Sequence, residues 1–361
     1  MNNTVTRLAA QGVSVWLDGS DGALGTPGAL RNLIGEGDVT GIAAPRSPSA
    51  RTVRTDSTSA AEALWDLAVE DARQLCDQLL PVHEATAGRE GLVSVDVDPR
   101  NAWDAGATLA EARALWRAVD RPNLMVRIPA TVQNLPVITA CLAETMNVNA
   151  ALIFSSDRLD SVAGAFLDGL EQAHARGSGP SPVCAVASFS VGDLDTEVDR
   201  ALERAGTAEA RALMGTSAIA NARLAYEGFQ QALASSRWRA LAAAGAGAPR
   251  LVWTSTSVRH PEHRDTRYVE ELIAPGTVHA MSADVLRAVA DHAQIHGDSV
   301  RRHYADARRV LSYLPWFGIS HQTAVALLHA AGLRKAIAER EELLSAVAGR
   351  LTVRKGALAS L

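Results

Sequence analysis

The sequence predicts a single (β/α)₈ TIM barrel followed by extra C-terminal helices. Eight short apolar runs rich in β-forming residues occur along the chain, and each is followed by a longer stretch that can form a helix. Strands that alternate with helices imply right-handed βαβ units and a parallel sheet. Eight such units favour closure into a barrel, although the pattern alone also allows an open doubly wound sheet. A barrel of about 250 residues with a helical addition accounts for a chain of 361 residues.

The expected strands are short, and most are rich in valine, isoleucine and leucine. They are Val13–Leu17, Val39–Ala44, Leu92–Val97, Leu124–Ile128, Val148–Phe154, Val183–Phe189, Leu251–Thr254 and Thr277–Met281. Helices are expected at Leu109–Val119 and Arg158–Ala175, and after the last strand at Ser282–His292 and Gln322–Val347.

The helical pattern is clearest between the sixth and seventh strands. Apolar residues recur there at spacings of three and four, at Ile219, Ala222, Tyr226, Phe229 and Leu233. This spacing gives one apolar face, and Arg223, Glu227 and Gln230 are expected outside it. An outer helix of a barrel accounts for the stripe.

Composition and charge limit the classes of partner. No long polar linker divides the chain, so we expect one domain over residues 1–361, with residues 283–361 as a helical extension packed on the barrel. The start of the chain has no apolar run of signal-peptide length, and no run could cross a bilayer, so a cytoplasmic protein is expected. A net charge of −5 without a basic stripe argues against nucleic acids and anionic membranes as partners. Cys76, Cys141 and Cys184 are expected to be small core residues, and neither a metal nor a cofactor is expected.

A series of motifs follows the expected strand ends in order. They are Val13-Ser-Val-Trp-Leu-Asp18, Val93-Ser-Val-Asp-Val-Asp-Pro99, Pro122-Asn-Leu-Met-Val-Arg-Ile-Pro-Ala-Thr131, Asn147-Val-Asn149, Ala187-Ser-Phe189 and Trp253-Thr-Ser-Thr-Ser257. Together they resemble the transaldolase family in its longer bacterial form, over roughly residues 10 to 350. The resemblance implies the same barrel that the strand pattern predicts.

The resemblance also implies a Schiff base between a ketose carbonyl and a lysine at the end of the fourth strand. The matching residue here is Arg127. A guanidinium stays protonated and has no nucleophilic lone pair, so it cannot form an imine. The chain has two lysines, Lys335 and Lys355, and both fall in the C-terminal extension. We therefore expect Schiff-base aldol transfer to be absent.

Three further residues complete the catalytic set that the resemblance implies. Asp18 matches the first-strand acid that helps carbon–carbon cleavage. Asp96 matches the third-strand glutamate that works as acid and base, but it is one methylene shorter, which can break the contact that proton transfer needs. Asn149 is retained, whereas the threonine hydroxyl expected two residues later is lost at Ala151. The expected catalytic residues are Asp18, Asp96, Arg127 and Asn149.

A second set is expected to bind the substrate. Ser188 matches a serine that contacts phosphate, but Asp193 stands where the family has an arginine, and a carboxylate there would repel a phosphate dianion. In the second-strand loop, Ala43-Ala-Pro-Arg46 replaces Thr-Ser-Asn-Pro. The expected substrate-binding residues are Arg46, Ser188, Asp193, Ser255 and Arg259.

Several of these residues also have purely structural interpretations. Arg127 can form an internal salt bridge with Asp18 or Asp96. Asn149 is as suited to tying strands together as to contacting a ligand. Near the upper face, one of His260, His263 and His279 could be an acid or base, although histidines in loops are usually just solvated.

Three functions remain open at this point. The lost polar residues are mostly replaced by other polar ones, which favours a repurposed enzyme of specialised metabolism acting on a small polar substrate by acid/base or electrostatic catalysis. Ala43, Pro45 and Ala151 instead favour a non-catalytic pseudoenzyme that binds a metabolite or a protein partner. An active transaldolase, which moves a dihydroxyacetone unit between sugar phosphates, would need an unorthodox lysine. The sequence thus predicts an enzyme without classical transaldolase activity.

Overall fold

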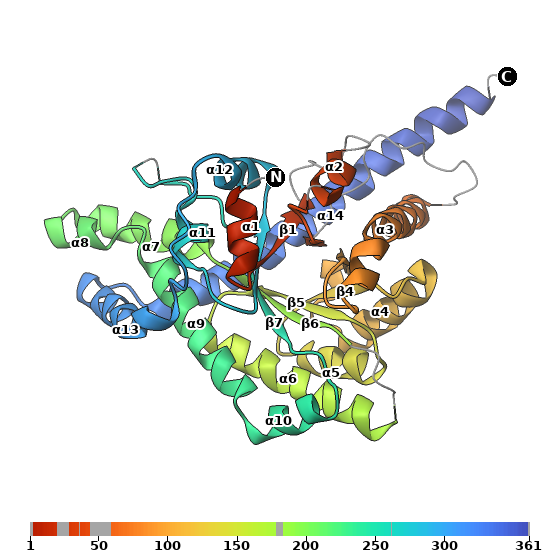
Figure 1. The fold of residues 1–361 in the computed structure, drawn as a ribbon. Coiled ribbons are helices and arrows are strands. Elements are labelled where there is room, and N and C mark those ends of the chain that lie inside the picture. The colour runs from red at the N-terminus through yellow and green to blue at the C-terminus, as the bar shows by residue number, and fades with distance from the viewer. Residues whose placement is uncertain are drawn as a thin grey trace.

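The strands form a closed parallel barrel (Figure 1). The computed structural model describes residues 3–19, 29–35, 37–43, 59–177, 183–260 and 262–359. In order around the barrel, the strands are β1 Ser14–Asp18, β2 Gly41–Ala43, β3 Leu92–Asp96, β4 Leu124–Pro129, β5 Val148–Ile153, β6 Ala185–Ser190, β7 Arg250–Thr254 and β8 Thr277–Met281. β8 pairs with β1 and closes the ring. The predicted (β/α)₈ barrel is confirmed, and the open sheet is excluded.

The second strand begins two residues later than the Val39–Ala44 run that the sequence predicts. Its described residues are Gly41–Ala43, and Ala44 lies outside the described part of the chain. A Cβ atom on Gly41 would lie 2.6 Å from Nε1 of the buried Trp16. Glycine is therefore needed where the backbone of β2 passes the indole ring.

Helices surround the barrel. They are α1 Asn3–Ala10, α2 Ala29–Gly35, α3 Ala60–Ala85, α4 Ala105–Val119, α5 Leu135–Ala143, α6 Ser156–Ala175, α7 Gly192–Ala205, α8 Ala208–Leu213, α9 Ser217–Leu233, α10 Ser236–Ala243, α11 Arg267–Glu271, α12 Ala283–His292, α13 Tyr304–Tyr313 and α14 His321–Ala359, with short 3₁₀ turns η3 Pro99–Asn101, η4 Arg301–His303 and η5 Leu314–Phe317. Several helices start at a capping side chain that accepts a hydrogen bond from the backbone N–H three residues further on, as at Ser59, Asp104, Ser155, Ser235 and Ser282.

Helix α9 carries the predicted apolar stripe, with one correction. Its stripe residues are buried or packed against the core. Arg223, expected outside the stripe, is also buried, and its Nη2 lies 2.6 Å from Oε2 of Glu271. The expectation was wrong because an ion pair from the end of α11 compensates the burial of this guanidinium.

Inside the barrel, an apolar layer lies beneath a polar one. The apolar layer contains Trp16, Leu92, Met125, Val186, Val252 and Val278. Side chains alternate between the two faces of a strand. Asp18 is two residues after Trp16, Arg127 two after Met125, and Ser188 two after Val186, so all three face the interior above this layer. The polar groups thus gather toward the C-terminal ends of the strands, where active sites of this fold lie.

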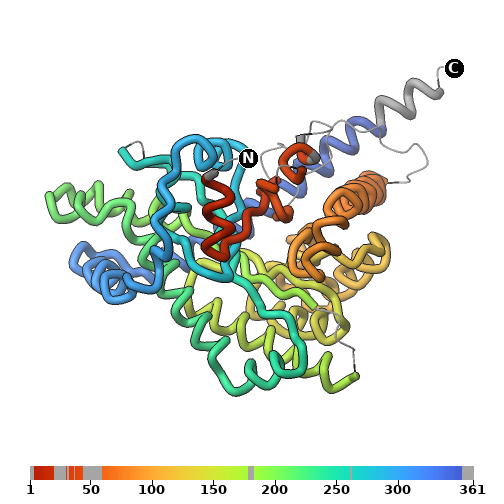
Figure 2. The backbone as a smooth tube through the Cα atoms, in the orientation of Figure 1, coloured from red at the N-terminus to blue at the C-terminus, as the bar shows by residue number. Residues whose placement is uncertain are grey.

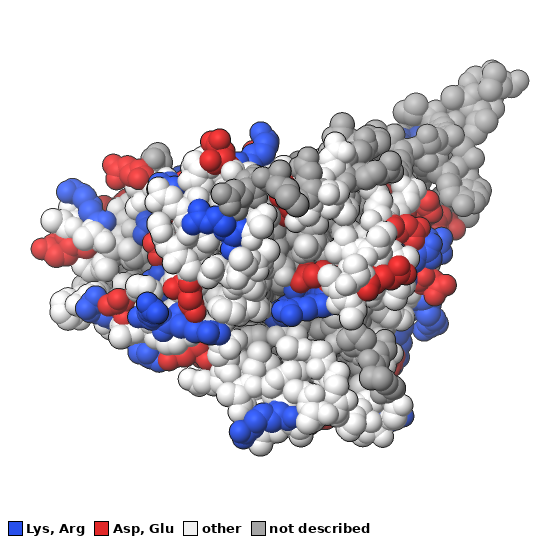
Figure 3. Space-filling view, in the orientation of Figure 1, with Lys and Arg blue, Asp and Glu red and all other residues white. Residues whose placement is uncertain are grey.

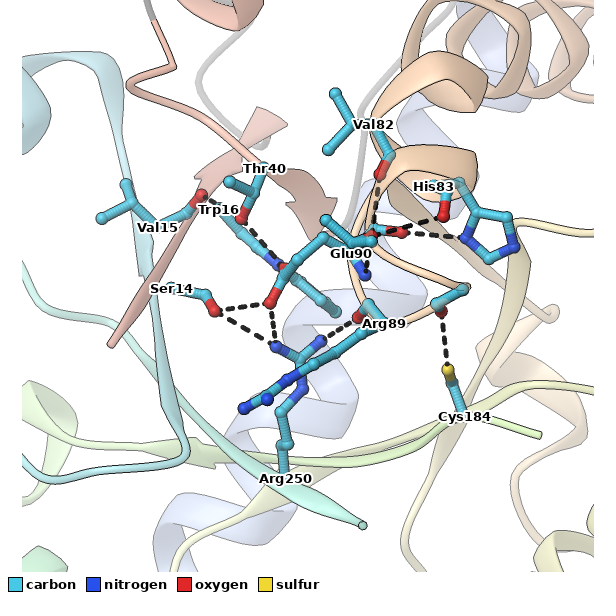
Figure 4. Close-up of polar contacts among 12 residues, drawn as sticks. Ser14, Val15, Trp16, Thr40, Val82, His83, Arg89, Glu90, Cys184 and Arg250 are labelled. Carbon is cyan, nitrogen blue, oxygen red and sulfur yellow. Dashed lines mark hydrogen bonds and ion pairs between the residues drawn. The ribbon is translucent and has the colours of Figure 1, made fainter. Parts of the chain in front are cut away.

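A buried ion pair between Glu90 and Arg250 closes the opposite end of the barrel (Figure 4). Glu90 lies just before β3 and Arg250 begins β7, and their side chains are only 11% and 6% exposed. The Glu90 carboxylate also accepts hydrogen bonds from Ser14 Oγ at 2.6 Å, Thr40 Oγ1 at 3.0 Å and Trp16 Nε1 at 3.2 Å. One carboxylate therefore ties β1, the start of β2 and β7 together.

After β8 the chain continues in helices, and the last of them, α14, extends away from the barrel (Figures 1 and 2). Val347 and Leu351 of α14 pack on Ala63, Leu64 and Leu67 of α3. At the other terminus, α1 contacts α12. The first and last parts of the chain are thus both packed against other helices.

Basic and acidic side chains are intermixed on the face of the molecule drawn in Figure 3. Cys76 and Cys141 are buried, as expected, and Cys184 is partly buried. Within the described residues, no helix combines the length and the apolar character needed to span a membrane.

Candidate functional site

An ion pair joins β3 and β4 near the open end of the barrel. Arg127 Nη1 lies 2.6 Å from Asp96 Oδ1, and the two residues are opposite each other in the strand pairing. The Arg127 side chain is 20% exposed and that of Asp96 is 46% exposed. Of the two salt bridges that the sequence allows for Arg127, the structure shows the one with Asp96. A cation and a carboxylate therefore face the mouth of the barrel together.

Asn149 lies deeper and connects three strands. Its Nδ2 donates to Ser94 Oγ at 3.0 Å, and Ser188 Oγ donates to its Oδ1 at 2.8 Å. Both Asn149 and Ser188 are buried. These contacts fit the structural interpretation of Asn149, because its amide satisfies hydroxyls of β3 and β6 inside the barrel.

A second polar cluster lies where β6 and β7 end. Ser190 Oγ donates to Asp193 Oδ2 at 2.7 Å and lies 2.9 Å from Ser255 Oγ, and Arg259 Nη2 is 3.4 Å from Asp193 Oδ1. Ser255 has a positive φ of 54°, a left-handed conformation that is uncommon outside glycine and often found at functional sites. Asp193, Ser255 and Arg259, all expected in the substrate-binding set, are thus brought together. Ser190 was not among the expected residues, although its position two residues after Ser188 puts it on the same face of β6.

Of the two remaining expected residues, the structure describes Asp18. Asp18 is the last residue of β1, pairs along the backbone with Ala43 of β2, and is partly buried. Arg46, expected to bind substrate, lies outside the described residues. The residues expected to be catalytic are therefore spread over β1, β3, β4 and β5, on the faces of these strands that point into the barrel.

One of the three histidines, His279, differs from expectation. His279 is fully buried on the outer side of β8, its Nε2 is 3.2 Å from the carbonyl oxygen of Leu272, and burial lowers its pKa to about 4. It is enclosed and neutral, so its placement at the upper face as an acid or base was wrong. His260 and His263 lie after β7 with ring centroids 4.7 Å apart. In the part of the chain that the structure describes, no group of three or more metal-binding side chains is arranged to hold an ion.

The two lysines lie in α14. The side chain of Lys335 is 74% exposed and its Nζ is 3.9 Å from Glu339 Oε1. Lys355 belongs to the same helix, and its side chain lies outside the described residues. The strands carry no lysine.

Comparison with known proteins identifies the family. The family described as Transaldolase/Fructose-6-phosphate aldolase matches residues 44–347. A transaldolase of Thermobifida fusca is 46% identical over 97% of this chain and 99% of its own length. The chain belongs to the transaldolase family. Transaldolases of Frankia alni and Streptomyces avermitilis are 42% and 44% identical, over 97% of this chain and at least 97% of their own lengths.

These relatives correct the expectation about function. A repurposed enzyme of specialised metabolism, without transaldolase activity, was expected from the substitutions around Arg127. Proteins named transaldolases match the chain at 42–46% identity over nearly its whole length, which contradicts that expectation and supports the active transaldolase. The pseudoenzyme interpretation gains no support either. The error came from giving a few strand-end positions more weight than the rest of the chain.

Proposed function

We propose that the chain is a transaldolase that moves a three-carbon ketose unit between sugar phosphates at the open end of the barrel. The observation that carries this proposal is its 46% identity to a named transaldolase over 97% of its length. The polar groups at the strand ends support it, because carboxylates and a guanidinium face the same mouth, where Arg127 pairs with Asp96. Both kinds of group can bind hydroxyls, and the carboxylates can also accept and return protons.

The reaction needs a proton acceptor and a group that stabilises negative charge. In fructose 6-phosphate the C3–C4 bond breaks, the C4 hydroxyl loses its proton, and glyceraldehyde 3-phosphate leaves. The electron pair stays on the three-carbon unit, which attacks the aldehyde carbon of the acceptor, and the proton returns to the new hydroxyl. Asp18 and Asp96 supply carboxylates for taking up and returning this proton.

The finer part of the proposal concerns residue 127, where we infer from the family resemblance that Arg127 stands in place of the imine-forming lysine. The guanidinium of Arg127 stays charged and can donate hydrogen bonds to the C2 oxygen while negative charge builds up there. In serine proteases, removal of a catalytic-triad residue still leaves about 10³–10⁴-fold acceleration over water from binding and electrostatics. We therefore expect transfer that is slow and proceeds without a covalent intermediate.

Release of glyceraldehyde 3-phosphate from fructose 6-phosphate, with a tetrose phosphate as acceptor, tests the function in a coupled dehydrogenase assay. We expect turnover by the wild type, loss in Asp18→Asn and faster turnover in Arg127→Lys. Arg121→Lys is the matched control, since Arg121 lies before β4 and pairs with Asp77 outside the barrel mouth. Absence of turnover by the wild type would overturn the proposal.

Borohydride reduction in the presence of fructose 6-phosphate tests the finer part. Peptide mapping should find no adduct on the wild type and an adduct on residue 127 of Arg127→Lys. An adduct on Lys335 or Lys355 of the wild type would contradict the role given to the guanidinium and leave the transaldolase function intact.

A further inference from the structure

Helix α14 contacts the C-terminal ends of both strands that flank β4. A Cβ on Gly332 would lie 3.1 Å from Phe154 Cζ and 3.3 Å from Leu152 Cδ2, at the end of β5. Eight residues further along the helix, Arg340 Nε lies 3.7 Å from Oδ2 of Asp98, just after β3. Eight helical residues cover about 12 Å, which is close to the roughly 10 Å across two strand spacings. The helix therefore bridges β3 and β5 beside the strand that carries Arg127.

Asp98 is the acceptor at the β3 end of this bridge. Its carboxylate is buried and accepts hydrogen bonds from the backbone N–H and the side chain of Arg100. Burial alone would raise the pKa of Asp98, but the bonds from Arg100 and the charges of Arg340 and Arg100 outweigh it and lower that pKa. Arg340 Nε is itself buried, and among the described residues it has no hydrogen-bond partner. Its attraction to Asp98 therefore acts as a charge–charge interaction that water screens little.

The loop that contains Asp98 begins at the catalytic pair. One buried residue, Val97, separates Asp98 from Asp96, and its N–H donates to the carbonyl oxygen of Arg127 at 3.1 Å. On the other side, the N–H of Asp98 donates to Glu111 Oε1 of α4 at 2.9 Å. The end of β3 is thus held by β4, by α4 and, through Arg340, by the C-terminal helix.

We propose that Arg340 is a positioning residue: its charge holds Asp98 and thereby keeps the Asp96 carboxylate in place against Arg127. The inference rests on the proposed transaldolase function. Other contacts keep α14 on the barrel without Arg340, since Val347 and Leu351 pack on α3 and His321 Nε2 lies 3.1 Å from Asn221 Oδ1. Removal of the charge should therefore disturb the catalytic pair without undocking the helix.

The test compares Arg340→Gln and Arg340→Lys with Lys335→Gln, which removes an exposed charge from the same helix. We expect Arg340→Gln to lower kcat for aldol transfer by up to about 10²-fold, the range for a small misplacement of a catalytic group, with KM little changed. Arg340→Lys should restore most of the rate because it keeps the charge, and Lys335→Gln should match the wild type. An unchanged kcat in Arg340→Gln, or equal losses in both Arg340 variants, would overturn the inference.

Hydrogen exchange separates this inference from the proposed function. In Arg340→Gln, backbone amides of residues 97–104 should exchange faster than in the wild type, whereas Lys335→Gln should leave them unchanged. This readout needs no substrate, so it holds even if the wild type shows no turnover. Unchanged exchange at residues 97–104 in Arg340→Gln would refute the positioning role.

Discussion

Replacement of Arg250 by methionine removes the cation from a carboxylate enclosed at the base of the barrel (Figure 4). Among the described residues, the donors left to the Glu90 carboxylate would all be neutral, from Ser14, Thr40 and Trp16. The variant also loses the bond from Arg250 Nη2 to the carbonyl oxygen of Arg89, 2.7 Å long. Loss of one partner from a buried ion pair costs about 3–5 kcal/mol, because the other charge stays buried without compensation. We expect the free energy of unfolding to fall by that amount.

Urea unfolding followed by tryptophan fluorescence measures this loss, and a double-mutant cycle isolates the pair. Glu90→Gln in the Arg250→Met background should cost less than it does alone, with a coupling of about 0.5–3 kcal/mol. Arg287→Met is the control, because Arg287 pairs with Asp284 on the surface and such pairs contribute at most about 1 kcal/mol. Equal losses of stability in Arg250→Met and Arg287→Met, or additive losses in the cycle, would show that the buried ion pair does not stabilise the barrel as expected.

Three further predictions concern stability. Asn149→Ala leaves two buried serine hydroxyls without their partner and should cost about 1–3 kcal/mol in urea unfolding; an unchanged midpoint would contradict the role of this amide in tying strands. The pKa of His279 is lowered by burial from 6.5 to about 4, so its contribution to stability is complete above pH 6.5 and is lost as the pH falls toward 4. Between pH 6.5 and pH 4, the free energy of unfolding should therefore fall less steeply in His279→Gln than in the wild type. Parallel plots of the free energy of unfolding against pH for the two proteins would contradict this prediction. Gly41→Ala should lower the free energy of unfolding by about 1–3 kcal/mol, because the new methyl group overlaps Trp16. Gly164→Ala, in an open helical position, should leave the stability unchanged or raise it. A larger loss of stability in Gly164→Ala than in Gly41→Ala would contradict the close packing of β2 on Trp16.

The fold was predictable because local sequence patterns agree with the global structure. Leu92–Val97 and Thr277–Met281 stand out in the sequence as short apolar runs, and the period of two along each strand places their side chains. Polar groups with distant partners were harder to place. Arg223 and His279 are buried because Glu271 and the carbonyl of Leu272 meet them there, and no pattern in the sequence reports such pairings.

The site was predictable residue by residue, but not as a set of contacts. The motifs indicated Asp96, Arg127 and Asp193. The hydrogen bonds that connect Asp193 to Ser255 pass through Ser190, and they form because the ends of β6 and β7 lie next to each other. The contact of Arg340 with Asp98 joins residues far apart in the sequence. The function could not be predicted from the substituted strand-end positions, because the similarity to transaldolases extends along nearly the whole chain.

Isotope transfer tests the central claim most directly. Fructose 6-phosphate labelled with ¹³C at C1, C2 and C3 is incubated with the protein and a tetrose phosphate, and the products are analysed by mass spectrometry. We expect a seven-carbon ketose phosphate that carries all three labelled carbons, together with unlabelled glyceraldehyde 3-phosphate. Recovery of the labelled fructose 6-phosphate unchanged, with enzyme in stoichiometric amount, would contradict it.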